Sequence, residues 1–120
     1  MIQMADHRIE GGERAMQHLL KLPTRPTAVI ASNDLTAIGA LGAIHGAGLR
    51  VPEDMSLVGF DDISFAHLTQ PPLTTIVLSR TQLAITALTA LDKLARKDAT
   101  PPGEYTIPTH LVLRRSTRAI

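Results

Sequence analysis

The chain has 120 residues, of which 44% are apolar, and 12 lysines and arginines nearly balance 11 aspartates and glutamates, giving a net charge of +1. This length suggests one domain, and the balanced charge argues against a surface built to attract nucleic acid or anionic membranes. The lack of cysteine excludes disulfides and thiolate metal sites, and no apolar run is long enough to span a bilayer.

The first half of the chain predicts helices that alternate with strands. Residues 11–22, GGERAMQHLLKL, place apolar side chains at helical spacing and are followed by prolines. The continuous apolar run at residues 27–31, TAVIA, is typical of a strand buried on both faces. A second helix is expected over residues 34–45, because Ser32 or Asn33 can cap its first turn. This helix is apolar nearly all round, so it needs a second partner besides the sheet.

The second half continues the alternation. Residues 56–60, SLVGF, and 74–77, TTIV, predict two further strands, and residues 80–97 form a strongly amphipathic helical pattern. Residues 104–108, EYTIP, and 110–116, HLVLRRS, indicate two short strands or one interrupted strand. The order of elements predicts the α/β class, with a largely parallel sheet flanked by helices.

Polar residues follow two of the predicted strands. SND, ending at Asp34, follows the first strand, and Asp61 and Asp62 follow the second in GFDDI. Ligands of parallel sheets bind outside the carboxyl ends of strands, so these positions are candidates for a site. The two aspartates are either turn residues or acceptors for adjacent hydroxyls of a sugar or nucleoside. Asn33 is a helix cap that can also face a cleft.

Other kinds of site find little support. Adjacent aspartates on extended backbone point to opposite sides, so catalysis by the pair is not expected. A metal site would need more oxygen ligands than this segment has. The histidines lack metal-binding spacing, no G-x-S-x-G occurs, and three aromatic residues are too few for a base-stacking surface. The basic cluster of Arg114, Arg115 and Arg118 is more typical of a solvated tail than of a phosphate site. No cofactor is expected.

Four segments together carry a family resemblance: PTAVIASNDLTAIGAL, GLRVPEDMSLVGFDDI, PPLTTI and LVLRRST. In this order and spacing they resemble the lactose/galactose repressor family of bacterial transcription regulators, over about residues 9–118. The resemblance implies that residues 1–120 form the C-terminal effector-binding subdomain of a periplasmic-binding-protein-like (type I) fold. The family's N-terminal subdomain and helix-turn-helix DNA-binding domain are absent from this chain, so it would reach DNA only through that absent domain.

The resemblance also assigns roles to residues of the candidate site. Asn33 and Asp61 match residues that hydrogen-bond the effector, and Phe60 is a packing neighbour. Asp62 is expected to shape the turn. Arg80 stands where the family often has an apolar or aromatic residue, and this departure favours a more polar or anionic effector.

A homodimer is the expected assembly. In the family, the helix over residues 34–45 and the segment after GFDD form a two-fold interface. The matching positions here are Thr36, Ala40, Ala43, Ile63, Phe65 and Leu68. The helix over residues 80–97 packs on the N-terminal subdomain in the family. It therefore lacks its partner here and offers a second route to association, by swapping.

The expected function is the ligand-sensing and dimerisation part of a bacterial transcriptional regulator, a repressor by resemblance. It would bind a small sugar-like effector, catalyse nothing and contact no membrane. The alternative is a periplasmic sugar-binding receptor module for transport or chemotaxis. The polar N-terminus lacks the apolar core of a signal peptide, which favours the regulator and a cytoplasmic location.

Overall fold

The computed structural model describes residues 1–96 and 103–119. Its elements are α1 (Ile9–Leu20), β1 (Ala28–Ile30), α2 (Asp34–Gly46), β2 (Ser56–Phe60), β3 (Thr74–Leu78), α3 (Arg80–Ala95) and β4 (Thr109–Val112). The chain folds as two compact units. The first unit combines residues 1–77 with the C-terminal residues from 111 onward, and the second is residues 78–110.

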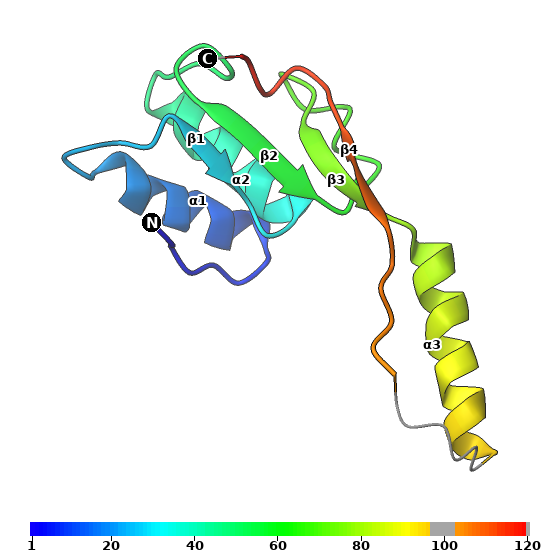
Figure 1. Cartoon of the computed structure of the whole chain (residues 1–120). Coiled ribbons are helices and arrows are strands. Elements are labelled where there is room, and N and C mark those ends of the chain that lie inside the picture. The colour runs from blue at the N-terminus through cyan, green and yellow to red at the C-terminus, as the bar shows by residue number, and fades with distance from the viewer. Residues whose placement is uncertain (97–102, 120) are drawn as a thin grey trace. The chain divides into compact units, whose positions relative to one another are not determined.

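The strands form one sheet in the order β1-β2-β3-β4 (Figure 1). β1 pairs with β2 in parallel, with Ile30 opposite Val58. β2 pairs with β3 in parallel, with Phe60 opposite Ile76. The carboxyl ends of these strands therefore lie at one edge of the sheet, and the predicted α/β class is confirmed.

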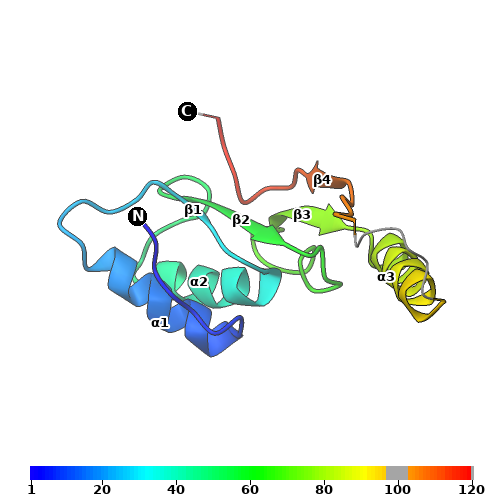
Figure 2. The same ribbon diagram turned by 60° about the horizontal axis from the view of Figure 1, so that its bottom comes forward.

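The helices of the first unit, α1 and α2, lie on one face of the sheet (Figure 2). β2 shows the resulting alternation, because Leu57 and Gly59 are buried while Val58 and Phe60 are only half-buried. In β1, Ile30 is 79% exposed. The prediction that the first strand is buried on both faces is therefore wrong for the described residues, whose helices in this unit cover one face only.

Glycines bring α1 and α2 together. A side chain at Gly12 would overlap the backbone of Thr36, and one at Gly39 would overlap the backbone carbonyl of Ile9. The two helix axes can approach closely only because these positions carry no Cβ. Met16 and Ile44, one from each helix, are almost wholly buried in the core. The second partner that the apolar helix α2 requires, besides the sheet, is therefore α1.

Several element boundaries differ from the sequence pattern. α1 begins at Ile9, two residues before the predicted start. Residues 104–108 form no strand, and only Thr109–Val112 pairs with the sheet. Pro108 lacks the amide hydrogen that a strand ladder needs, so pairing begins after it.

In the second unit, α3 has no buried residue among those described. Its exposed large side chains include Leu83, Leu88, Leu91 and Leu94. The predicted helix extended to residue 97, which lies outside the described residues. That this helix packs on an N-terminal subdomain remains a prediction. Among the described residues, no helix has the length and apolar character needed to cross a membrane.

Candidate functional site

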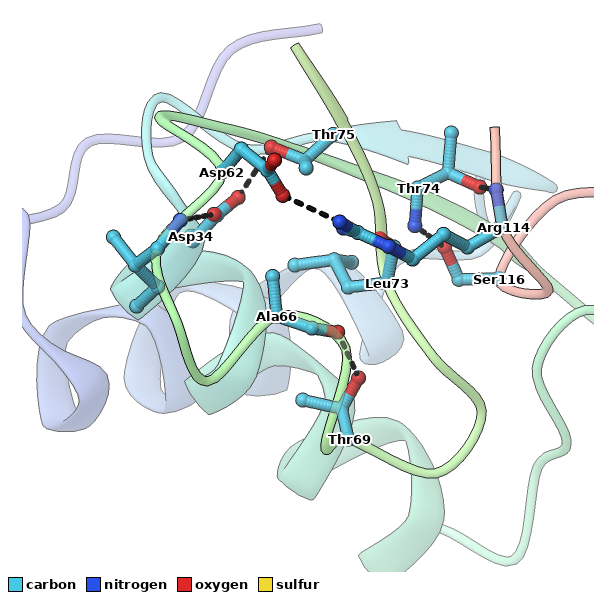
Figure 3. Close-up of polar contacts among 10 residues, drawn as sticks. Asp34, Asp62, Ala66, Thr69, Leu73, Thr74, Thr75, Arg114 and Ser116 are labelled. Carbon is cyan, nitrogen blue, oxygen red and sulfur yellow. Dashed lines mark hydrogen bonds and ion pairs between the residues drawn. The ribbon is translucent and has the colours of Figure 1, made fainter. Parts of the chain in front are cut away.

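Asp34 joins the two polar motifs that follow β1 and β2. It is the first residue of α2, and its side chain is wholly inaccessible to solvent. One carboxylate oxygen accepts a hydrogen bond from the Ile63 amide at 2.9 Å, and the other accepts one from the Thr75 hydroxyl at 2.6 Å (Figure 3). One side chain thereby connects three parts of the fold: the start of α2, the loop after β2 and the strand β3. The interpretation of Asp34 as a helix-start residue describes only part of this role.

Asn33 caps α2 and binds the segment before α1. Its side-chain oxygen accepts a hydrogen bond from the Thr36 amide at 2.9 Å, and its side-chain nitrogen donates to the His7 carbonyl at 3.1 Å. The Ser32 hydroxyl lies 3.1 Å from Nδ1 of the same histidine. A primary amide has two donor hydrogens, so the bond to His7 uses only one of them.

His7 is therefore a member of this polar group that sequence reasoning missed. It lies 26 residues before Asn33 along the chain, and no motif connects the two positions. Its backbone φ of 61° is in the left-handed region. That unusual conformation is visible only in the structure.

Asp61 and Asp62 form a left-handed turn directly after β2. Their φ angles are 108° and 51°, a region that residues with a Cβ adopt at an energetic cost. The Asp61 amide donates to the carbonyl of Ile76 at 2.8 Å. An oxygen of Asp62 lies 2.6 Å from a guanidinium nitrogen of Arg114, with both side chains mostly buried. The carboxylate of Asp62 is thus used within the chain, as a turn-shaping residue requires.

The interpretation of the C-terminal basic cluster as a solvated tail is wrong for Arg114. Its side chain is only 19% exposed, and besides Asp62 it donates to the carbonyl of Leu73 at 2.8 Å. Arg115 and Arg118 are exposed, as expected. The sequence places Arg114 52 residues from Asp62, so no local pattern indicates the pair.

Ser116 anchors the same C-terminal segment. Its buried hydroxyl donates to the Leu57 carbonyl at 2.6 Å and accepts from the Thr74 amide at 2.7 Å. Leu57 in turn donates its amide to the Ser116 carbonyl at 2.7 Å. The segment after β4 is therefore a structural part of the first unit, and it holds Arg114 in place (Figure 3).

The remaining candidate effector residues lie at element ends. Phe60 is the last residue of β2 and is half-buried. Arg80 is the first residue of α3, is exposed and belongs to the second unit. Effector contact by Asn33, Phe60, Asp61 and Arg80 remains a prediction.

The structure corrects the interface predicted on α2. Thr36, Ala40 and Ala43 are 7%, 3% and 6% exposed, and the two alanines belong to the hydrophobic core. These three side chains therefore have no surface to offer a second copy. Phe65 and Leu68, in contrast, are 61% and 66% exposed, and Ile63 is half-buried.

A cavity of about 570 Å³ lies beside β1 in the first unit. The N-terminal residues 1–5, α1 and β1 supply most of its lining, which is largely apolar. It shares His7 and Ser32 with the polar group described above, but Asn33, Phe60 and Asp61 do not line it. The polar residues at the strand ends, rather than this cavity, define the candidate site. No cluster of three or more potential metal ligands occurs among the described residues.

The family of the chain follows from its match to a known domain. A family model for the periplasmic binding protein-like domain matches residues 1–117. The chain belongs to this family. This periplasmic binding protein-like chain is 40% identical, over 119 residues, to the HTH-type transcriptional repressor CytR of Escherichia coli K12, a match covering 99% of the chain and 35% of the relative.

Solved structures agree with this assignment. A lac repressor dimer bound to operator and the anti-inducer ONPF superposes with a TM-score of 0.87 at 36% identity, covering 96% of this chain and 40% of that one. A LacI family regulator from Enterococcus faecalis V583 with bound ribose gives 0.81 at 34% identity, covering 94% and 42%. The predicted relationship to the lactose/galactose repressors is confirmed, and these relatives are transcription regulators rather than enzymes. The periplasmic binding protein-like chain spans about a third of the length of its curated relatives.

Proposed function

We propose that this chain is the effector-sensing part of a bacterial transcriptional repressor and that it binds a small sugar-like polyol. The observation that carries the proposal is that Asn33 and Asp61 follow the carboxyl ends of two neighbouring parallel strands, β1 and β2. The ribose present in the Enterococcus faecalis regulator supports the ligand class. The relatives named as repressors favour this function over a periplasmic receptor module.

The chemistry of the site suits a polyol. The carboxylate of Asp61 can accept from two neighbouring hydroxyls, and the amide of Asn33 has a second donor hydrogen. Phe60 would provide apolar contact beside them. In the whole protein, effector binding would change DNA affinity only as far as the effector distinguishes two conformations. This mechanism needs no catalysis, and a regulator of this kind would act in the cytoplasm, where the DNA is.

Replacing Asp61 with asparagine tests the binding role. We expect the affinity for ribose, measured by NMR chemical-shift titration of the chain, to fall about 10-fold to 100-fold, because charge-assisted hydrogen bonds contribute roughly 1.5–3 kcal/mol. Asp92→Asn, an exposed carboxylate on α3, is the control and should leave affinity unchanged. Ribose binding that is saturable and indifferent to Asp61→Asn would place the site elsewhere.

Ribose 5-phosphate in the same titrations tests Arg80. If Arg80 selects an anionic effector, the phosphorylated sugar binds more tightly than ribose, and Arg80→Phe removes the difference. Equal affinities for the two sugars would contradict this role.

We further propose that the chain forms a two-fold dimer through the segment containing Ile63, Phe65 and Leu68. The relative solved as a lac repressor dimer supports this assembly. Exposed apolar side chains are costly in water, and a self-complementary contact would cover them. The exposed surface of α2, not its buried residues, would complete the interface.

Two matched leucines distinguish this interface from swapping through α3. Leu68 and Leu88 are each 66% exposed, the first on the proposed interface and the second on α3. In size-exclusion chromatography with light scattering, we expect Leu68→Glu to shift the mass toward the monomer and Leu88→Glu to leave the dimer intact. The reverse result would assign association to α3.

A further inference from the structure

The turn that carries Asp61 is held in its left-handed conformation from outside. Two consecutive residues with a Cβ, Asp61 and Asp62, have positive φ angles of 108° and 51°. Such a backbone persists only when surrounding contacts fix it. Contacts among the described residues include a bond from the Asp61 amide to Ile76 of β3, a bond from the following amide of Ile63 to the buried carboxylate of Asp34, and the pair of Asp62 with Arg114.

The contact with Arg114 brings a positive charge to the turn. Asp61 and Asp62 are adjacent in sequence, and the carboxylate of Asp34 bonds the next amide in the chain. Like charges at close range repel, more strongly where solvent is partly excluded. The guanidinium of Arg114, at 2.6 Å from Asp62, offsets this repulsion at the turn.

Arg114 is itself held by further hydrogen bonds. Its second guanidinium nitrogen donates to the Leu73 carbonyl at 2.8 Å, and its backbone amide donates to the Thr74 hydroxyl at 3.0 Å. Two residues later, buried Ser116 bonds both Leu57 and Thr74. The arginine therefore reaches the turn from a segment anchored to β2 and β3, as Figure 3 shows.

We propose that Arg114 is a positioning residue for the effector site. It neutralises and fixes Asp62, and the fixed turn orients the carboxylate of Asp61 toward the effector. Arg114 itself touches no effector. The inference rests on the proposed function in its last step, the contact between Asp61 and a polyol, while the clamp on the turn stands on the geometry alone.

The test compares Arg114→Met with Arg115→Met in the full chain. Arg115 is the adjacent arginine, with an exposed side chain, so the control removes an equal charge one position away. Three-bond HN–Hα couplings of Asp61 and Asp62 report φ without any ligand, and ribose titration reports affinity. We expect Arg114→Met to change both couplings from their wild-type values and to bind ribose at least about 10-fold more weakly. Arg115→Met should keep both, and Arg114→Lys should restore part of the affinity.

A double-mutant cycle with Asp62→Asn shows whether Arg114 acts through Asp62. In the Asp62→Asn background, Arg114→Met should change ribose affinity much less than in the wild type. Urea unfolding of each variant separates local loosening from loss of the fold, and the lysine variant serves if the methionine variant does not fold.

Wild-type couplings in folded Arg114→Met would overturn the clamp. Altered couplings with unchanged ribose affinity would overturn the link to Asp61. If the wild-type chain binds no ribose, the proposed effector class is wrong. The couplings measured without ligand still decide whether Arg114 holds the turn.

Discussion

Asp34→Ala should destabilise the first unit by about 2–4 kcal/mol, because it leaves the half-buried amide of Ile63 and the buried hydroxyl of Thr75 without their acceptor. The carboxylate of Asp34 is wholly buried and accepts from Ile63 and Thr75, which belong to the loop after β2 and to β3. Urea unfolding followed by circular dichroism measures the loss. Asp92→Ala removes an exposed carboxylate whose partner is Arg96, and such surface pairs contribute under about 1 kcal/mol.

A second substitution shows whether the hydrogen bond to Thr75 accounts for part of this loss. Thr75→Val keeps the side-chain shape and removes the hydroxyl that donates to Asp34. The combined cost of Asp34→Ala and Thr75→Val should be smaller than the sum of the single costs, because both remove one shared bond. Additive costs, or an Asp34→Ala chain as stable as the wild type, would show that this buried network does not hold the sheet to α2.

The sequence allowed the turn after β2 and the cap of α2 to be predicted because the relevant signals are local. An apolar run followed by GFDDI predicts a strand with a carboxylate turn at its end, and β2 has the predicted bounds, Ser56–Phe60. The cap at Asn33 likewise depends on residues three apart. Parallel pairing then brings two strand ends to one edge of the sheet, which is a general property of the α/β class.

The partners of these residues could not be predicted, because they come from distant parts of the chain. Arg114 and Asp62 are 52 residues apart, and His7 and Asn33 are 26 apart. A helix that is apolar on every side also gives no periodic signal for which face is buried. The buried face of α2, with Ala40, is decided by where α1 can approach, and two glycines set that approach.

Gly39→Ala should therefore destabilise the first unit by about 1–3 kcal/mol, the usual cost of overpacking a close contact. An added methyl group would overlap backbone atoms of Ile9 and approach those of Glu13, which a rotamer change cannot relieve. Gly42→Ala is a control in the same helix, because no atom lies within 4 Å of its added Cβ. It should stabilise the helix by roughly 0.5–1 kcal/mol, since alanine is the better helix former. Thermal or urea unfolding should show a lower free energy of unfolding for Gly39→Ala and a higher one for Gly42→Ala, each compared with the wild type.

The same two variants test whether the packing of α1 on α2 affects ribose binding. α1 begins at Ile9, two residues after His7, whose carbonyl accepts from Asn33. Displacing α1 from Gly39 would therefore move His7 away from the cap of α2 and weaken ribose binding. Gly42→Ala leaves that contact intact and should bind ribose as the wild type does. Equal stability of the two variants would contradict the close approach of α1 and α2. Equal ribose affinity in folded Gly39→Ala would show that the polar group around Asn33 does not depend on α1.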